Sequence, residues 1–370
     1  MKFLVCNNGY LSPVPSGGDN HLLGIGEALS LDHEVTFILP DFASKLLCPA
    51  IKHRTYKTWQ PHSPFGIIGA YLSRIVKARK AALHEPADVV LASSSPVDII
   101  PALLNRHRHG SCVVVYPFHI THHRKIYTIA SLFQNMVALT AQRLAFSMMQ
   151  HADIIFTDNK IVANELTTKG IQAKKIHLQK PVVNVEAIEK SHALHQFQVL
   201  FIGRMVKSKG IFDLVDALKK IPVNAALIGD GEELPSLKKY VQKNELSDRI
   251  SILGPLPSEK MYALLKGCDL FVFPSYEEGY GIAIAEAIAA KRPIIAYDLQ
   301  HYREAFNNSL ITVPVGDVNA LTNKIRSFFE KRLNIKAIIE KYQHVELANK
   351  KNAAHLELSI IKTVMRSKDL

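Results

Sequence analysis

The sequence predicts an α/β protein of two doubly wound domains, each a parallel sheet with helices on both faces. Three observations support this prediction. Apolar runs typical of strands alternate with helical segments, the alternation restarts from a new first strand at residues 198–202, and 370 residues suffice for two domains. The 48% apolar fraction excludes a disordered chain, and no run of about 18 apolar residues predicts a membrane span.

The first domain is expected over residues 1–190. Residues 3–6 form a continuous apolar run, which is typical of a buried strand, and a glycine-rich turn and a helix over residues 21–31 follow it. Further strands are predicted at residues 34–39, 88–92, 111–116 and 153–157. The polar stretch 180–197 interrupts this rhythm, so we interpret it as an interdomain linker.

The second domain is expected over residues 191–370. Its strands are predicted at residues 198–202, 225–228, 250–253, 270–273 and 293–297, with helices such as 211–220 and 258–266 between them. From about residue 335 the chain reads as a charged helical tail of this domain.

Positive charge is concentrated in the first half of the chain, which has a formal net charge of +12 overall. Residues 42–84 hold eight Lys or Arg, and residues 99–152 hold five, with no Asp or Glu in either stretch. Such a surface attracts a nucleic acid, an anionic lipid or a phosphorylated substrate, although a generally basic solvated surface explains it equally. Nucleic acid is disfavoured, because there is one Trp and no arginine-rich arm.

Four cysteines stand far apart with no paired spacing, which predicts reduced thiols in a cytoplasm and no zinc site. The apolar start, residues 1–6, is too short for the apolar region of a signal peptide. We therefore expect a cytoplasmic protein.

Two glycines, Gly17 and Gly18, occupy the turn between the first strand and the first helix. Glycines there let the backbone approach a phosphate, to which the helix N-terminus offers free N–H groups. A glycine turn without a ligand is the alternative. The dinucleotide fingerprint of a dehydrogenase is absent, because Gly24 and Gly26 fall inside the predicted helix.

A second turn opens the second domain with two cations. The strand ends at Gly203, and Arg204 and Lys209 follow before the next helix. They lie at the carboxyl end of a parallel strand, where open α/β sheets bind ligands. An arginine fork with a lysine point charge suits a diphosphate, whereas incidental surface cations are the alternative.

The most specific pattern is a strand, a Gly-x-Gly turn and an alanine-rich helix with one charge, Glu286. Burying that carboxylate is costly unless it meets hydroxyl or N–H groups, and the alternative is that it reaches solvent. Glu278 lies at the end of the strand, beside free backbone N–H groups. The residues that together predict a nucleotide-sugar pocket are Glu278, Gly279, Tyr280, Gly281, Ile282 and Glu286.

The second half resembles the retaining glycosyltransferases of family 4, also called glycosyl transferases group 1. The motifs that carry the resemblance occur in order over residues 198–320: Gly203-Arg204 with Lys209-Gly210, Leu227-Ile228-Gly229-Asp230-Gly231, Leu253-Gly254-Pro255-Leu256, Asp269 to Ser275, and Glu278-x7-Glu286. The first half matches only loosely. The resemblance implies the GT-B fold, in which two Rossmann-like domains face each other across a cleft.

The resemblance also implies roles. Arg204 and Lys209 would neutralise the donor diphosphate, and the Gly17-Gly18 turn would present the Gly18 amide to it. Glu278 and the following amides would hold the transferred sugar, and Glu286 the ribose. Gly229, Asp230 and Leu253 would border the base. The active-site histidine would be His119, directly after a strand. His122 is the second candidate, and a histidine with a purely structural role is the other alternative.

We therefore expect a retaining, hexosyltransferase-type enzyme that uses a nucleotide-diphosphate sugar and a glycan or lipid-linked acceptor. No Asp-x-Asp motif occurs, so we expect no metal and no cofactor. A sugar-nucleotide epimerase of the same fold and a non-catalytic sugar-nucleotide-binding protein are the alternatives.

A membrane surface is a further expected partner. Residues 125–149 predict a helix with apolar side chains near a 3.6 period and only two charges, Lys125 and Arg143. With the basic cluster 74–80, this favours an interfacial helix on anionic lipid at the inner face of the membrane. The alternative is an internal helix packed on the sheet of the first domain.

Overall fold

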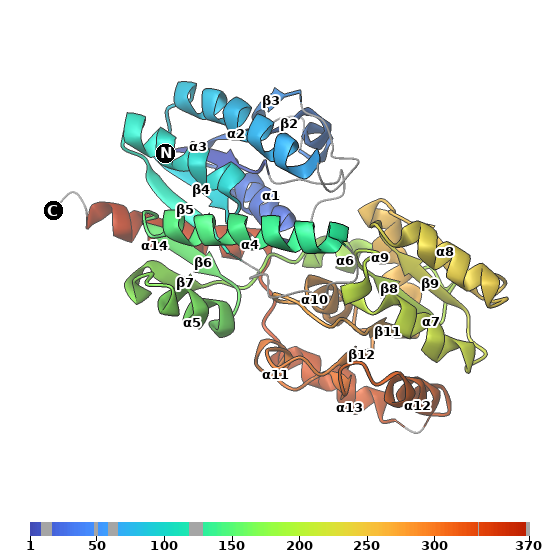
Figure 1. The fold of residues 1–370 in the computed structure, drawn as a ribbon. Coiled ribbons are helices and arrows are strands. Elements are labelled where there is room, and N and C mark those ends of the chain that lie inside the picture. The colour runs from blue at the N-terminus through green and yellow to red at the C-terminus, as the bar shows by residue number, and fades with distance from the viewer. Residues whose placement is uncertain (9–16, 48–50, 58–65, 118–128, 332, 368–370) are drawn as a thin grey trace. The chain divides into compact units, whose positions relative to one another are not determined.

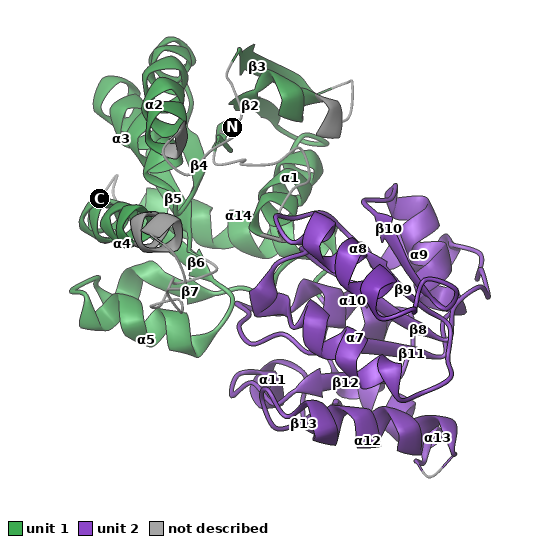
Figure 2. Cartoon of the chain, turned by 45° about the vertical axis from the view of Figure 1, so that its right-hand side comes forward, with its two compact units in different colours: residues 1–182, 348–370 green, residues 183–347 purple. Residues whose placement is uncertain are grey.

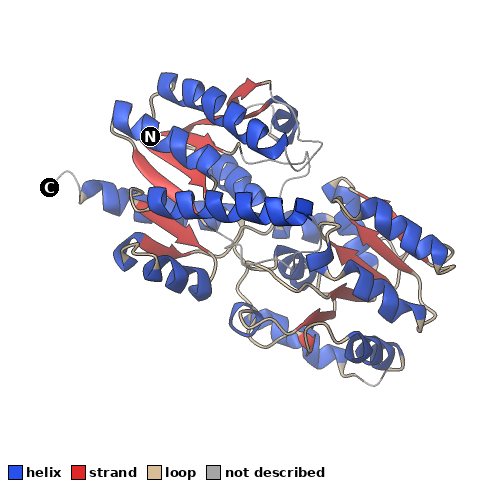
Figure 3. Ribbon diagram, in the orientation of Figure 1, coloured by secondary structure: helices blue, strands red, loops and turns tan. Residues whose placement is uncertain are grey.

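The computed structural model describes the chain except for residues 9–16, 48–50, 58–65, 118–128, 332 and 368–370. Two compact units form, residues 1–182 with 348–370 (unit 1) and residues 183–347 (unit 2), coloured separately in Figure 2. Each has a parallel sheet between helices, as Figures 1 and 3 show. The predicted architecture of two doubly wound domains is therefore confirmed.

The sheet of unit 1 has the strand order β3-β2-β1-β4-β5-β6-β7, and all its described pairings are parallel. The strands are β1 (Lys2–Cys6), β2 (Glu34–Pro40), β3 (Lys52–Tyr56), β4 (Val89–Ser93), β5 (Cys112–Tyr116), β6 (Ile154–Thr157) and β7 (Ile176–Leu178). The helices of the unit are α1 (Gly17–Leu29), α2 (Gly66–His84), α3 (Pro96–His109), α4 (Ile129–Met149), α5 (Lys160–Thr168) and α14 (Lys350–Arg366), with 3₁₀ turns η1 (Asp41–Leu46) and η2 (Ala173–Lys175).

Alternate side chains of the strands separate two apolar layers in unit 1, as expected for a sheet buried on both faces. Phe3 and Val5 pack with side chains of α1 and α14 on one face. Leu4 and Cys6 pack with α2, α3, α4 and α5 on the other. The sheet is therefore a buried central layer, and its loops carry the polar groups.

The sheet of unit 2 has the order β10-β9-β8-β11-β12-β13, again with parallel pairings. Its strands are β8 (Val199–Ile202), β9 (Ala225–Ile228), β10 (Ile250–Gly254), β11 (Leu270–Phe273), β12 (Ile294–Tyr297) and β13 (Ile311–Val313). The helices are α6 (Val185–Lys190), α7 (Ile211–Lys219), α8 (Leu234–Lys243), α9 (Ser258–Gly267), α10 (Ile282–Ala289), α11 (Tyr302–Ala305), α12 (Val318–Phe329) and α13 (Ile335–Glu340), with 3₁₀ turns η3 (Lys207–Lys209) and η4 (Lys341–His344).

The unit boundaries differ from those inferred from the sequence, which divided the chain after residue 190 and kept the tail with the second half. Residues 183–190 belong to unit 2, where α6 contacts α9 and α10 and its Ile188 is fully buried. The C-terminal α14 belongs to unit 1 and lies among its elements in Figures 1 and 2. The physical reason is its apolar face: Ala353, Ala354 and Ile361 are buried against the core that α1 covers.

Two polar side chains from distant parts of unit 1 meet a buried carboxylate of α14. Glu357 accepts a hydrogen bond from the Tyr116 hydroxyl at 2.6 Å, and its other oxygen lies 3.1 Å from His21 Nε2. The Val182 N–H donates to His21 Nδ1 at 3.1 Å, so the proton of this imidazole is on Nε2 and is donated to Glu357. Because all three side chains are buried, this network fixes α14 on the sheet.

Among the described helices, none combines the length and the hydropathy that crossing a bilayer requires.

Candidate functional site

The loops that carry the predicted donor residues meet at one point of the sheet of unit 2. Strands β8 and β11 are hydrogen-bonded neighbours, but the chain continues from β8 toward β9 on one side and from β11 toward β12 on the other. Open α/β sheets bind ligands at the carboxyl ends of the two strands where such a reversal occurs.

Lys209 connects these two loops. It ends η3, after β8, and its side chain is mostly buried. Its Nζ donates to Glu278 Oε1 at 2.6 Å and to the carbonyl of Glu277 at 2.8 Å, both in the loop after β11. A lysine and a glutamate that are 69 positions apart in the sequence therefore form one charged pair at the switch point.

The backbones of the same loops are also in close contact. The Tyr276 N–H donates to the Ser208 carbonyl at 2.8 Å. Gly210 has a φ of +65°, and a Cβ at this position would lie 1.9 Å from the carbonyl oxygen of Pro274. Only glycine permits both the conformation and the approach, so Gly210 helps to set the distance at which Lys209 meets Glu278.

Arg204 belongs to the same loop after β8 but is exposed, and the described residues provide no hydrogen bond or ion pair for its guanidinium. The preceding Gly203 donates its N–H to the Ile228 carbonyl at 3.0 Å. The site therefore contains one cation compensated by a carboxylate and one cation open to solvent.

The loops after β9 and β10 extend the same edge. The Gly229 N–H donates to the Gly254 carbonyl at 2.9 Å, and the Met205 N–H donates to the Asp230 carbonyl at 2.9 Å. The Asp230 carboxylate accepts from the Gly231 N–H at 2.8 Å. Leu253 is half-buried at the end of β10. The structure thus brings the predicted base-side residues to the loop edge that also carries Arg204.

The turn of residues 279–281 leads from Glu278 into α10, whose N-terminal residue is the predicted Ile282. Glu286 lies one turn further along this helix, and the Tyr262 hydroxyl of α9 donates to its Oε1 at 3.0 Å. Burial raises the pKa of the Glu286 carboxyl to about 7, and the hydrogen bond from Tyr262 opposes that rise. The prediction that this lone carboxylate needs a hydroxyl partner is met by a tyrosine that the sequence analysis did not identify.

Two further residues escaped the sequence analysis, His301 and Tyr302, in the segment that follows β12. Tyr302 is 1% exposed, and its ring lies next to Gly281. No sequence pattern indicated this proximity, because neither residue belongs to a recognisable motif.

In unit 1, Gly17 and Gly18 are the first two residues of α1, at the carboxyl edge of β1. A buried polar cluster occupies the same edge. Asp98 accepts from the Asn8 N–H at 2.6 Å and from the Asn8 side-chain amide at 2.7 Å, and burial raises the pKa of Asp98 to about 7. His119 and its competitor His122 lie outside the described residues.

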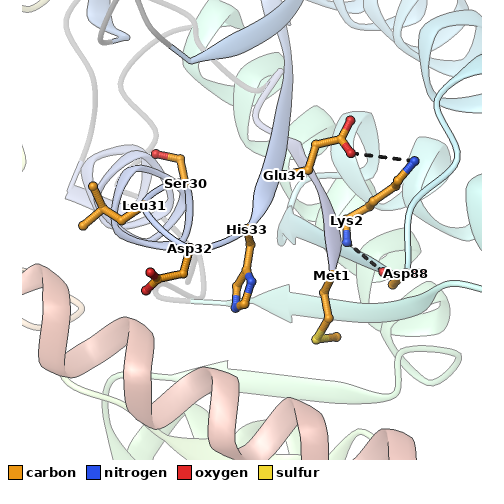
Figure 4. Close-up of a pocket in the computed structure, with 8 residues that line it drawn as sticks. All are labelled: Met1, Lys2, Ser30, Leu31, Asp32, His33, Glu34 and Asp88. Carbon is orange, nitrogen blue, oxygen red and sulfur yellow. Dashed lines mark hydrogen bonds and ion pairs between the residues drawn. The ribbon is translucent and has the colours of Figure 1, made fainter.

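Unit 1 also has a surface hollow at the opposite edge of its sheet (Figure 4). Residues from the start of β1, the turn that follows α1 and the start of β2 line it, together with Asp88. Lys2 forms an ion pair with Glu34 at 3.7 Å, and the backbone N–H of Lys2 donates to Asp88 at 2.7 Å. Because these groups lie at the amino ends of the strands, the hollow is separate from the loop edge described above.

Comparisons with known proteins identify the family of the chain and its fold. The family model described as Glycosyl transferases group 1 matches residues 184–348, and the model described as Glycosyltransferase Family 4 matches residues 15–187. An uncharacterized glycosyltransferase of Methanocaldococcus jannaschii is 38% identical over 97 residues, which are 26% of this chain and 27% of that protein. The O-antigen chain mannosyltransferase B of Escherichia coli is 24% identical over 311 residues, which are 81% of each chain.

Among solved structures, Anabaena HepE in complex with UDP superimposes with a TM-score of 0.75 at 17% identity, covering 98% of this chain and 100% of that one. A likeness at this identity concerns the fold. The match covers between about a quarter and half of the length of the first four curated relatives.

Proposed function

The chain belongs to the family 4, group 1 glycosyltransferases and has the GT-B fold, and from that premise we propose that it is a retaining, metal-independent enzyme of hexosyltransferase type. It transfers a sugar from a nucleotide-diphosphate donor to a glycan or lipid-linked acceptor. The observation that carries the proposal is the contact of Lys209 with Glu278 at the switch point of the unit 2 sheet.

The donor diphosphate binds to Arg204 and Lys209. Arg204 is exposed and has a planar fork of donors, whereas Lys209 is held in place by Glu278 and the Glu277 carbonyl. Positive charge at this point stabilises the nucleoside diphosphate as it leaves, because negative charge develops there in the transition state. The two cations supply this stabilisation with no divalent metal.

The transferred sugar binds to Glu278 and to the backbone amides of the turn 279–281, and the ribose hydroxyls bind to Glu286. The base lies against the loops of Gly229, Asp230 and Leu253. Carboxylates accept strong hydrogen bonds from hydroxyl groups, so each one fixes one sugar ring of the donor.

In the reaction, the bond between the anomeric carbon and the diphosphate oxygen breaks, and the acceptor oxygen forms its bond on the same face. The acceptor's proton goes to the leaving phosphate, which is the base nearest to it. His119 positions the donor or the acceptor.

A uridine nucleotide is the first donor to test. The support is the HepE structure, which contains UDP on the same fold. The E. coli relative is an O-antigen chain mannosyltransferase, which supports an envelope glycan as the acceptor class and makes GDP-mannose the second donor to test.

The acceptor is presented at an anionic membrane surface, and α2 is the element that contacts it. Ile68, Leu72 and Val76 stand four residues apart on α2, and Leu72 and Val76 are each 59% exposed. Exposed Arg79 and Lys80 follow on the same helix. An exposed apolar stripe beside basic residues is typical of an interfacial helix.

This proposal adds α2 to the segment that the sequence indicated. In α4, Ala145, Phe146 and Met149 are buried in the unit 1 core, which supports the alternative of an internal helix for that part. Met136 and Leu144 of the same helix are exposed, as an interfacial helix requires. Arg74, which the sequence analysis counted in the basic cluster, is fully buried, so its charge does not face lipid.

A donor screen tests the proposal. Calorimetry with UDP, GDP and ADP, followed by turnover assays with their glucose, galactose and mannose conjugates, identifies the nucleotide and the sugar. A new glycoside with the donor's anomeric configuration is the expected product. An epimerised sugar nucleotide with no glycoside would identify an epimerase, and binding without turnover would identify a non-catalytic protein. Failure to bind any nucleoside diphosphate would overturn the proposal.

A further inference from the structure

Two buried polar atoms at the start of α11, one on its N-cap His301 and one on its first residue Tyr302, have no partner among the described residues. Tyr302 is 1% exposed, and among the described residues nothing forms a hydrogen bond with its hydroxyl. The adjacent His301 has a buried Nε2 that likewise has no partner among those residues. The two rings are in T-shaped contact, with centroids 4.7 Å apart. Leaving buried polar groups unsatisfied costs free energy, so two such atoms side by side require an explanation.

The position of these two atoms in unit 2 supplies an explanation. A Cβ on Gly281 would lie 3.2 Å from Cε1 of Tyr302, so the tyrosine ring packs directly on the turn that follows Glu278. Phe306 packs against the same turn, because its ring contacts both Tyr302 and Tyr280. The Tyr302 hydroxyl thus belongs to an aromatic cluster built around the turn of residues 279–281.

We propose that Tyr302 and His301 determine which sugar the enzyme transfers, by forming hydrogen bonds with hydroxyl groups of the donor sugar beside Glu278. This inference rests on the proposed function and adds to it two residues that recognise the donor sugar. The donor's hydroxyls would supply the hydrogen-bond partners that these two atoms lack among the described residues.

The chemistry of the three groups is complementary. Burial, and then the nearby carboxylate of Glu278, raise the pKa of Tyr302 well above its usual value, so its hydroxyl keeps its proton. Burial lowers the pKa of His301 to about 4, so its imidazole is neutral and offers one donor and one acceptor nitrogen. Together with the Glu278 acceptor, these groups can distinguish sugars that differ in the direction of one hydroxyl.

Tyr302→Phe is the discriminating variant, because it removes only the hydroxyl and keeps the ring that packs on Gly281. The matched control is Tyr342→Phe, another buried tyrosine of unit 2, whose hydroxyl donates to the Arg292 carbonyl at 2.9 Å. His301→Gln is the second variant, because it keeps a hydrogen-bonding group at that position while changing its reach.

Calorimetry measures each variant with UDP, UDP-glucose and UDP-galactose, and with GDP and GDP-mannose. For the sugar nucleotide that the parent protein binds tightest, Tyr302→Phe is expected to weaken binding about five- to tenfold, the loss of one hydrogen bond. Binding of the matching free nucleoside diphosphate is expected to stay unchanged, as are both affinities in Tyr342→Phe. His301→Gln is expected to change the preference between the glucose and galactose conjugates.

Three results would overturn the inference. Equal weakening of the sugar nucleotide and of the free diphosphate would assign Tyr302 a purely structural role. Unchanged binding of both in Tyr302→Phe and His301→Gln would mean that the two atoms are served by bound water. If the parent protein bound none of the nucleoside diphosphates, the proposed function itself would fail, and this inference with it.

Discussion

Lys209 and Arg204 are the two cations of the site, and they are held differently. Lys209 is paired with Glu278, whereas Arg204 is exposed to solvent. We expect Arg204→Ala and Lys209→Ala each to weaken binding of donor and free nucleoside diphosphate, by about 1.5–3 kcal/mol for one charge-assisted contact. Calorimetry with the nucleoside diphosphate measures this loss.

Lys207→Ala is the control for these variants. It removes a positive charge from the 3₁₀ turn that also holds Lys209, but Lys207 pairs with Glu233 at 3.5 Å rather than with the site carboxylate. Unchanged diphosphate affinity in Arg204→Ala and Lys209→Ala, or an equal loss in Lys207→Ala, would contradict the assignment.

The raised pKa of Glu286 predicts how protein stability and nucleotide affinity depend on pH. Its pKa of about 7 lies above the ordinary value of 4.5, so between these limits the folded protein holds a proton that the unfolded chain releases. Stability contributed by this group is therefore present below pH 4.5 and is lost as the pH rises through 7. The ribose needs the ionised form, so we expect nucleotide affinity to rise between pH 6 and pH 8.

Glu286→Gln tests both consequences. At pH 8 we expect a higher melting temperature of the free protein, nucleotide binding weaker by about 1.5–3 kcal/mol, and no rise of affinity from pH 6 to pH 8. A variant that kept the pH dependence of the parent would show that another group is responsible.

At the scale of elements, α14 is attached to unit 1 through Glu357. Glu357→Ala leaves the buried Tyr116 hydroxyl and the proton on His21 Nε2 without their acceptor. We expect it to destabilise the protein by about 2–4 kcal/mol, measured by urea unfolding. His355→Ala, an exposed position of the same helix, is the control and is expected to change stability little. Equal stability of the two variants would rule out the role assigned to the buried network.

The exposed stripe of α2 predicts co-sedimentation with anionic vesicles but not with neutral ones. Each surface Lys or Arg contributes about 1 kcal/mol, and added salt weakens the attraction. Leu72→Ser is expected to reduce recovery, whereas Leu31→Ser, an exposed leucine outside α2, is expected to leave it unchanged. Recovery that does not depend on lipid charge, or equal effects of both variants, would exclude α2 as the contact.

For the whole molecule, the two cations predict turnover without a divalent metal. The sequence has no Asp-x-Asp motif, so charge on the leaving diphosphate is balanced by Arg204 and Lys209. Activity with the donor found in the screen is expected to survive excess EDTA. Loss of activity that magnesium or manganese restores would overturn this expectation.

The sequence by itself determined the parallel α/β architecture, because buried strands appear as continuous apolar runs and their following turns as glycine-rich segments. It also singled out Lys209 and Glu278, since each belongs to the loop that follows such a strand. It missed β3, whose residues Lys52–Tyr56 are mostly polar and exposed at the sheet edge. An edge strand with little burial carries no hydrophobic periodicity to recognise.

Only the tertiary structure decided the features that depend on contacts between residues far apart in the sequence. The charged C-terminal tail reads like a solvated helix, yet α14 packs on unit 1, because its few apolar positions match a face of that sheet. Tyr302 lies on Gly281 although 21 positions separate them, since the loops after β11 and β12 share one edge of a parallel sheet. Local patterns in a sequence report burial and turns, whereas the meeting of two loops depends on strand order, which no local pattern contains.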